Sequence, residues 1–167
     1  GYAELLADPE GSRDYADRIL DTASSLVDLS EQASKLERVA GRDRTTIRID
    51  PDELLDAVLS PIRARAEDAT IETTTSTDRE ICAGPELEEA LRELVSNAIA
   101  HNPAPYPSVA IEVADRDAWI EICVTDDGPG IDELEQAMID RGEETSLEHG
   151  SGLGLWLVNW IVTRYGG

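Results

Sequence analysis

Residues 85–101 read Pro-Glu-Leu-Glu-Glu-Ala-Leu-Arg-Glu-Leu-Val-Ser-Asn-Ala-Ile-Ala-His and predict the helix around which the domain is built. Its apolar residues recur at spacings of three and four, as on the buried face of an amphipathic helix. Beside that face, Glu93, Asn97 and His101 are four residues apart and share one stripe. A carboxylate, an amide and an imidazole in line suit a divalent metal ion and phosphate oxygens. A solvated polar edge of the helix would produce the same pattern.

Alternating and helical patterns on either side of this helix predict a domain of mixed secondary structure. The predicted strands lie at 47–49, 69–75, 79–82, 109–113 and 120–124. Further helices are predicted from Pro51, where Asp50 is a suitable N-cap, at 132–140 and at 153–164. Strands and helices do not alternate strictly, so the expected fold class is α+β. We expect an α/β sandwich with a mixed, mainly antiparallel sheet and helices on one face.

Two glycine-containing segments follow the predicted central helix. The first, 126–131, reads Asp-Asp-Gly-Pro-Gly-Ile and comes directly after a strand, where glycine lets the backbone approach a flat ligand. A plain tight turn would use the same residues. The second, 150–155, reads Gly-Ser-Gly-Leu-Gly-Leu and leads into a helix, whose first N–H groups are available for phosphate. It differs from a dinucleotide fingerprint because no strand immediately precedes it.

Taken in order, the three motifs resemble the N, G1 and G2 boxes of the ATPase domain of sensor histidine kinases. They are Glu93-x-x-x-Asn97, Asp126-x-Gly128-x-Gly130 and Gly150-x-Gly152-x-Gly154. The wider superfamily includes gyrase, Hsp90 and MutL, and the resemblance covers roughly residues 43–167. It implies ATP as the nucleotide and Mg²⁺ as the metal ion.

The resemblance implies roles for the polar stripe of the central helix. Asn97 would be the Mg²⁺ ligand, with the ion bridging the ATP phosphates, and His101 would lie near those phosphates. Glu93 would be the catalytic residue, either orienting water or the metal's shell or acting as a base. Phosphoryl transfer depends mainly on positioning and charge neutralisation, so this set of groups is chemically sufficient.

The resemblance also implies which residues hold the nucleotide. Asp126 would accept a hydrogen bond from the adenine amino group, and Gly128 and Gly130 would leave room for the ring. A mobile lid would cover about 132–149. The remaining implied ATP-binding residues lie in the lid and the glycine-rich segment: Arg141, Thr145, Gly150, Ser151, Gly152, Leu153 and Gly154.

A heptad pattern in residues 12–40 predicts a separate helix with an apolar a/d seam. The seam consists of Ile19, Thr22, Leu26, Leu29, Ala33, Leu36 and Ala40. The helix resembles the second helix of a kinase dimerisation and phosphotransfer hairpin, and two such hairpins would form a dimeric four-helix bundle. A helix packed on its own domain is the alternative. The expected domains are therefore 1–41, a partial hairpin, and 42–167, the ATP-binding catalytic domain.

The expected activity is transfer of the ATP γ-phosphoryl group to a histidine and then to an aspartate on a response-regulator receiver domain. Three features depart from the family pattern. The acceptor histidine and the family's last strands are absent and would lie before Gly1 and after Gly167; Ala100 stands where a basic residue is common; and the lid lacks a phenylalanine. Two alternatives stay open: a dimeric signalling module with a vestigial nucleotide site, and an ATPase of another superfamily branch.

The composition limits the partners and the environment. The formal net charge is −22 in 167 residues, and Lys35 is the only lysine. This charge argues against nucleic acid or an anionic membrane surface as a partner, and it indicates adaptation to high salt. No apolar run is long enough to span a membrane and no signal peptide begins the chain, so we expect a cytoplasmic segment of a protein that upstream segments could attach to a membrane. Cys82 and Cys123 fit no metal spacing and are expected to be buried thiols.

Overall fold

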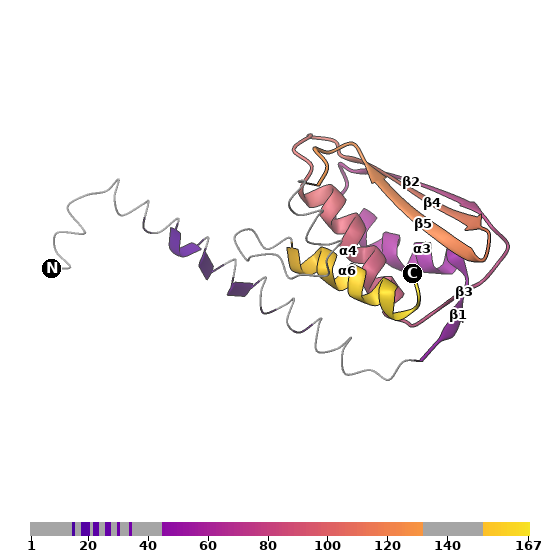
Figure 1. Cartoon of the computed structure of the whole chain (residues 1–167). Coiled ribbons are helices and arrows are strands. Elements are labelled where there is room, and N and C mark those ends of the chain that lie inside the picture. The colour runs from indigo at the N-terminus through magenta and orange to yellow at the C-terminus, as the bar shows by residue number, and fades with distance from the viewer. Residues whose placement is uncertain are drawn as a thin grey trace, which may run out of the picture. The chain divides into compact units, whose positions relative to one another are not determined.

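The computed structural model describes residues 45–131 and 152–167, together with some of the helical positions between Tyr15 and Ser34. Contacts divide the chain into two units, and one of them contains Arg42–Ser146 and Ser151–Gly167. All the elements labelled in Figure 1 belong to this unit. In the other unit, the seam residues Ile19, Thr22 and Leu26 are helical and exposed. The seam positions Leu29, Ala33, Leu36 and Ala40 lie outside the described residues.

The first helix of the domain, α3 (Pro51–Arg63), begins where its capping residues predict. Asp50 is the N-cap, and its Oδ1 accepts hydrogen bonds from the backbone N–H groups of Asp52 (2.9 Å) and Glu53 (3.2 Å). These bonds satisfy two of the donors that a helix start leaves unpaired. The residues predicted to face inward are all buried: Leu54, Leu55, Val58, Leu59 and Ile62.

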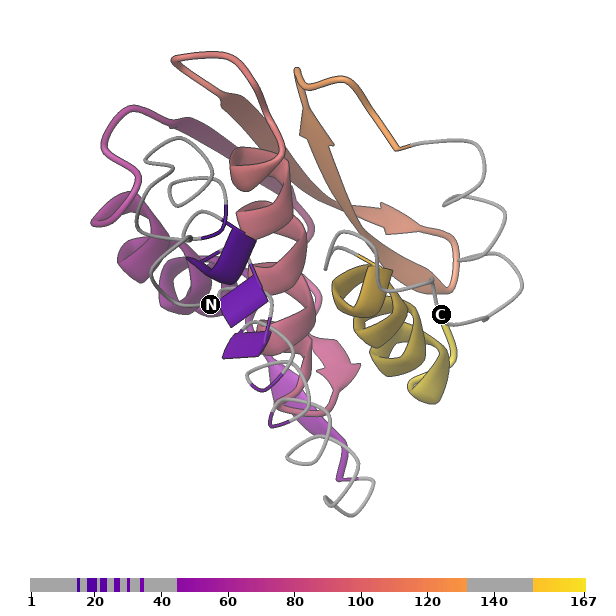
Figure 2. The same cartoon turned by 90° about the vertical axis from the view of Figure 1, so that its left-hand side faces the viewer.

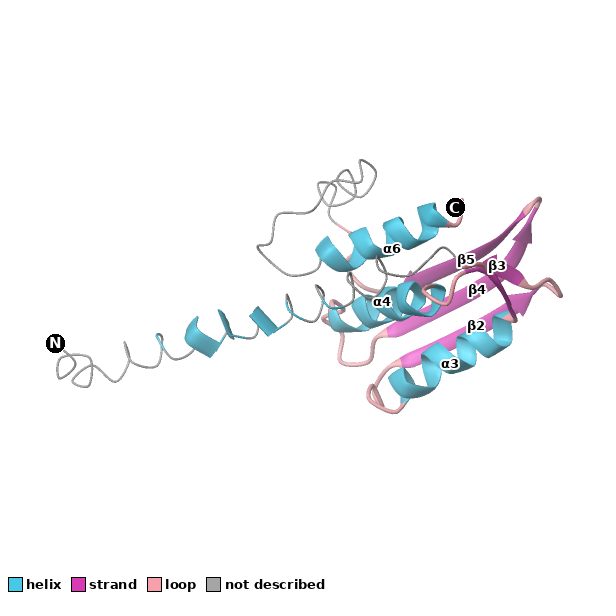
Figure 3. Cartoon of the chain, turned by 90° about the horizontal axis from the view of Figure 1, so that it is seen from below, coloured by secondary structure: helices cyan, strands magenta, loops and turns pink. Residues whose placement is uncertain are grey.

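The five predicted strands are all present and form two sheets. The short strands β1 (Ile47–Ile49) and β3 (Ile81–Ala83) pair antiparallel. The larger sheet has the order β2-β4-β5, made of Thr70–Ser76, Ser108–Arg116 and Trp119–Asp126. β2 runs parallel to β4, and β4 runs antiparallel to β5, so the sheet is mixed as expected (Figure 3).

One face of the larger sheet is covered and the other is polar. Val109, Ile111 and Val113 of β4 are buried with α3 and α4 (Leu87–Ala100) in a single apolar core. The register places Val124 and Ile122 of β5 opposite Ile111 and Val113, and both pack against that core. Residues of the opposite phase, such as Glu112 and Glu121, are exposed. The expectation of a sandwich with helices over one sheet face is confirmed (Figure 1).

The central helix α4 lies beside the last helix, α6 (Gly152–Arg164), as Figures 1 and 2 both show. α4 begins two residues later than Pro85, because Gly84, Pro85 and Glu86 form a turn in which the Leu87 N–H donates to the Gly84 carbonyl (3.1 Å). The Glu86 side chain makes no cap bond to the helix and serves another contact described below. Leu157 and Ile161 of α6 are buried.

The expectation that both cysteines are buried is wrong. Cys82 and Cys123 are exposed, free thiols. Side chains alternate between the two faces of a strand, and Cys123 has the phase of Glu121 and Thr125 on the polar face of β5. Its sulfur lies 3.8 Å from the Thr125 hydroxyl.

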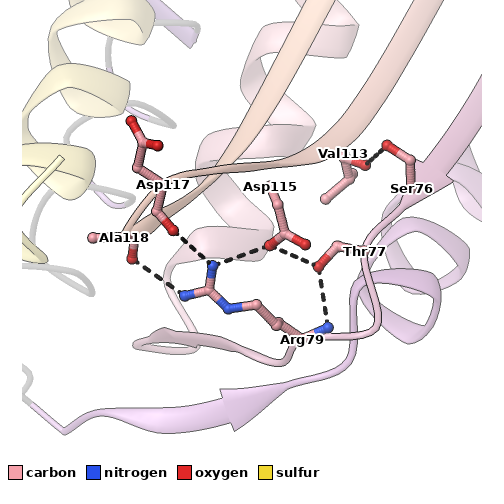
Figure 4. A network of polar contacts seen from close by, with 7 residues as sticks. All are labelled: Ser76, Thr77, Arg79, Val113, Asp115, Asp117 and Ala118. Atoms are coloured by element: carbon pink, nitrogen blue, oxygen red, sulfur yellow. Dashed lines mark hydrogen bonds and ion pairs between the residues drawn. The ribbon is translucent and has the colours of Figure 1, made fainter.

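A polar network ties the loop before β3 to the turn between β4 and β5 (Figure 4). The Arg79 guanidinium donates to the Asp115 carboxylate (3.0 Å) and to the backbone carbonyls of Asp117 (3.4 Å) and Ala118 (3.2 Å). The Thr77 hydroxyl donates to the same Asp115 oxygen (3.0 Å). Asp117 has φ +51°, a conformation that aspartate tolerates better than most residues. The planar guanidinium of Arg79, with several N–H donors, therefore holds the turn between β4 and β5 in place through side-chain and backbone acceptors.

An apolar hollow of about 490 Å³ lies among the start of α4, the later part of α6 and β5, with Leu87, Trp119 and Val162 in its lining. Its lining runs along α4 from Leu87 to Leu94 and does not include Asn97. None of the helices in the described residues combines the length and apolar character that crossing a membrane requires.

Candidate nucleotide site

The polar stripe of α4 meets the beginning of α6 at a glycine. Glu93 has only 9% of its surface exposed, although it is a carboxylate. A Cβ atom added to Gly154 would overlap the Glu93 Oε1 atom and come within 3.2 Å of Asn97 Nδ2. The third glycine of the 150–155 motif therefore permits the α6 backbone to lie directly on the stripe. Two motifs separated by more than fifty residues meet here.

Asn97 has hydrogen-bonding capacity that the described residues do not use. Its Nδ2 atom is buried and has no hydrogen-bond partner among them. A buried amide without a partner is unfavourable, so this atom indicates a place for a polar ligand. No group of three or more histidine, cysteine, aspartate or glutamate side chains in the described ranges is arranged to hold a metal ion. Mg²⁺ fits such a site only with few protein ligands, the others being water and phosphate oxygens.

The turn after β5 holds the second motif. Asp126 ends the strand, and its Oδ1 accepts a hydrogen bond from the Gly128 backbone N–H (2.8 Å). Its Oδ2 accepts no hydrogen bond from the described residues, and the side chain is exposed. Gly130 has φ +79°, a backbone conformation that favours glycine. Asp126 thus uses one oxygen for the turn, and its other oxygen has no partner among the described residues.

Two residues that the motifs did not single out connect this turn to α4. Asn102 follows the end of α4, and its Nδ2 donates to Asp127 Oδ1 (2.6 Å). The Ser108 backbone N–H donates to the same oxygen (2.9 Å), and the Asp127 N–H donates to the Ser108 carbonyl (3.2 Å). Asn102 and Asp127 therefore hold the Asp126 turn beside the end of α4. The Asn-Pro pair at 102–103, a turn signal, was the available hint.

The same contacts stabilise the charge on Asp127. The Ser108 backbone N–H contributes most, the Asn102 amide contributes next, and together they hold the pKa of Asp127 below its ordinary value of 3.8. Hydrogen bonds to a carboxylate favour its ionised form. Asp127 is therefore a charged anchor for the turn at neutral pH.

The remaining predicted site residues are placed as follows. His101 is the C-cap of α4, its backbone N–H donates to the Asn97 carbonyl (3.0 Å), and its side chain is exposed. Gly128 lies against Asn102, whose Cγ atom would be 3.6 Å from an added Cβ. Gly152 and Leu153 lie in the first turn of α6. Arg141, Thr145, Gly150 and Ser151 lie outside the described residues, as do the predicted lid and the helix predicted at 132–140.

Residues 83–167, about half of the chain, match the family described as histidine kinase-, DNA gyrase B- and HSP90-like ATPase. The chain belongs to this ATPase family. The matched range contains α4, the turn after β5 and α6, the three elements that carry the motifs.

Relatives within the family are sensor histidine kinases. The sensor-like histidine kinase SenX3 of Mycobacterium tuberculosis is 33% identical over 171 residues, which cover 96% of this chain and 42% of the relative. The histidine-protein kinase/phosphatase MprB of a Mycobacterium species is 29% identical over 124 residues, 71% of this chain and 24% of the relative. A solved structure of a mycobacterial sensor histidine kinase MprB aligns with a TM-score of 0.61 at 26% identity, covering 74% of this chain and 81% of that one. The chain thus spans less than half the length of the curated relatives.

Proposed function

We propose that this chain is the ATP-binding catalytic portion of a two-component sensor histidine kinase. In the whole protein it would transfer the γ-phosphoryl group of ATP to a histidine, from which an aspartate on a response-regulator receiver domain would take it. The observation that carries the proposal is the meeting of Glu93, Asn97 and Gly154, with an unused buried amide at Asn97. The relatedness to sensor histidine kinases supports the choice of this branch over other ATPases of the family.

Each group has a role that follows from its position. Asp126 Oδ2 accepts a hydrogen bond from the adenine amino group, while its Oδ1 keeps the turn in shape. The phosphates lie toward Asn97, His101 and the N-terminus of α6, where backbone N–H groups favour anions. Glu93 orients water or, in phosphotransfer, the attacking group, because its buried carboxylate is held in place beside Gly154.

Mg²⁺ suits this arrangement. Asn97 is the residue that would hold the ion, together with phosphate oxygens and water, as Mg²⁺ commonly prefers. When bound, the ion would neutralise phosphate charge during transfer. This matters here because the chain itself carries a net charge of −22.

Isothermal titration calorimetry with ATP, with and without Mg²⁺, in about 2–4 M KCl tests the site, since screening is nearly complete in that range. We expect Asn97→Ala to remove most of the Mg²⁺-dependent affinity and Asp126→Asn to weaken ATP binding at least tenfold, or about 1.4 kcal/mol. Ser96→Ala and Asp78→Asn are the matched controls, because both residues are exposed and neither takes part in the contacts described here. Circular dichroism checks that every variant is folded.

The result decides among the alternatives. If Asn97→Ala and Asp126→Asn bind ATP as well as the parent chain, the site assignment is wrong. If the parent shows no ATP affinity but forms stable dimers, the chain is a signalling module with a vestigial site. Steady ATP hydrolysis without phosphohistidine in the full-length protein would indicate a different kind of ATPase.

The proposal extends to the rest of the chain. Residues 1–41 form part of a dimerisation hairpin and 42–167 the catalytic domain, so that two copies associate through the seam that contains Ile19 and Leu26. The exposed, apolar character of these two side chains supports the idea. The segment works in the cytoplasm, at high salt, and next to the receiver domain of a response regulator.

A further inference from the structure

A partly buried hydrogen bond ties Tyr165, which directly follows α6, to the start of α4. The Tyr165 hydroxyl donates to Glu86 Oε2 at 2.9 Å, across 79 residues of sequence. Glu86 has 2% of its surface exposed, and its Oε1 has no hydrogen-bond partner in the described part of the chain. A buried carboxylate with an unpaired oxygen is unfavourable, and an apolar pair would fill the same space without that penalty. Packing alone therefore does not account for the pair.

The Tyr165 hydroxyl lies against Gly84, where any side chain would occupy its place. A Cβ atom added to Gly84 would overlap both the Tyr165 hydroxyl and Glu86 Oε2, and it would lie 2.5 Å from Tyr165 Cζ. Any side chain at Gly84 would push the tyrosine away. The turn before α4 thus forms a specific seat for the tip of this residue, with the acceptor and the space both present.

The contact of Tyr165 with Glu86 and the contact of Gly154 with Asn97 are separated by the same number of residues along both helices. Eleven residues separate Glu86 from Asn97, and eleven separate Gly154 from Tyr165. Since Glu86 meets Tyr165 while Asn97 meets Gly154, the helices run antiparallel and the two contacts lie about three turns, or roughly 16 Å, apart. Between them, Ala90 of α4 and both Leu157 and Ile161 of α6 are buried.

A shift of register would alter both contacts together. Sliding α6 by one residue requires a rotation of about 100° to keep the same face toward α4. Apolar side chains tolerate small adjustments of that kind, whereas a hydrogen bond into a glycine-lined seat does not. The hydrogen bond at the C-terminal end of α6, made by Tyr165, therefore restricts where Gly154, at the N-terminal end of the same helix, can lie.

We propose that Tyr165 is a positioning residue for the nucleotide site, acting through Glu86 and the register of α6 on the contact of Gly154 with Glu93 and Asn97. The inference rests on the proposed function, because the affected ligand is ATP. Tyr165 itself touches no nucleotide. Its hydroxyl sets the place of the α6 N-terminus three turns away, and that N-terminus offers its N–H groups to the phosphates.

The variants separate positioning from stability. Tyr165→Phe removes only the hydroxyl, and Glu86→Gln keeps an acceptor for it. The double variant Glu86→Met, Tyr165→Phe removes the buried charge together with its partner, so it should fold even where Tyr165→Phe does not. Thr163→Val is the matched control, since it removes a hydroxyl from the same helix whose bond, to Asn159 Oδ1 at 3.3 Å, is exposed and local.

Two measurements are made on each folded variant of the 167-residue chain in molar KCl: the ATP dissociation constant by calorimetry, and the NMR shifts of the Gly154 amide and the Asn97 side-chain amide without nucleotide. We expect Tyr165→Phe and the double variant to weaken ATP binding about three- to tenfold and to move both signals. Glu86→Gln should largely retain the parent values, because it keeps an acceptor for the Tyr165 hydroxyl, and Thr163→Val should leave both measurements unchanged.

The outcomes are distinct. If the double variant is as stable as the parent and binds ATP equally well with unmoved signals, Tyr165 has no positioning role. If Tyr165→Phe lowers stability alone, the same conclusion holds. If the parent does not bind ATP at all, the proposed function fails, but movement of the Gly154 and Asn97 signals in Tyr165→Phe would still support the register argument.

Discussion

Gly154 and Asn97 illustrate what a residue-level motif can and cannot predict. The spacing of Glu93, Asn97 and Gly154 predicts the kinds of group at the site, and the structure brings these three together. Asn102 and Asp127 were not predicted, although they hold the Asp126 turn to α4. Their hydrogen bond joins residues 25 positions apart. The Asn-Pro pair at 102–103 predicts a turn, but neither periodicity nor turn chemistry indicates which distant residue Asn102 contacts.

The Asp127 anchor gives a pH-dependent prediction. Its carboxyl has a pKa below 3.8 in the folded chain, so its stabilising effect is present above that value and is lost as the pH falls through the folded pKa. We expect Asn102→Ala to raise the pKa of Asp127 toward its ordinary value and to loosen the turn. Carboxyl NMR titration gives the pKa, and urea unfolding between pH 2 and 7 gives the stability.

The difference in unfolding midpoint between the parent and Asn102→Ala should be largest at neutral pH and shrink at acid pH. Asp78→Asn, in the exposed loop before β3, should shift neither the pKa of Asp127 nor the form of this pH dependence. A midpoint difference that stays constant down to pH 2 would show that Asn102 acts through its other bond, from the Ala104 N–H, rather than through Asp127.

The sequence predicts best those elements whose capping residues and apolar face can all be recognised in the local sequence. The α3 helix has its N-cap, its proline at N1 and its apolar face in sequence order, and all three are present. α4 begins two residues after the predicted Pro85, because Gly84, Pro85 and Glu86 form a turn and the Glu86 side chain contacts Tyr165 instead of capping the helix. Residue type alone predicts a buried Cys123, whereas its phase in β5, between Glu121 and Thr125, indicates the exposed face.

The seam of the N-terminal helix predicts a dimer that one substitution should disrupt. We expect Leu26→Glu to shift the chain from dimer to monomer, because it places a charge in an apolar seam. Leu20→Glu is the matched control, since Leu20 is also exposed, at 64%, but lies off the predicted seam. Sedimentation equilibrium at constant KCl measures the change.

Equal effects of the two substitutions would contradict the seam and indicate unspecific association of the helix. A parent chain that stays monomeric at high concentration would contradict dimerisation by this segment altogether.

At the level of the whole molecule, the fold and the charge make opposite demands on ATP binding. The fold places helix N–H donors and glycine backbone at the candidate site, whereas a net charge of −22 repels a polyanion. Molar salt reduces the screening length to about 3 Å and removes most of that repulsion. The sequence predicts the fold class because each helix and strand has its own hydrophobic pattern. The balance between attraction of ATP by backbone donors and repulsion by the net charge depends on where the charges lie in space, which the sequence does not show.

We therefore expect both ATP affinity and the free energy of unfolding to increase from 0.1 to about 3 M KCl. Calorimetry and urea unfolding measure the two quantities, and sorbitol at matched osmolality controls for water activity. The double variant Glu72→Gln, Glu112→Gln, on the exposed face of the sheet, should depend less on salt than the parent. Tighter ATP binding at low salt, with the fold intact, would contradict the prediction.

The polar face of the sheet, with Glu112 and Glu121 outward, has one more consequence, which concerns the solution around the protein. Electroneutrality requires each chain to be accompanied by an excess of 22 monovalent cations over anions. In dilute buffer, these ions outnumber the macromolecule and dominate its osmotic pressure. Concentrating the protein then means concentrating a salt, and during dialysis the retained chain keeps an excess of cations on its own side of the membrane.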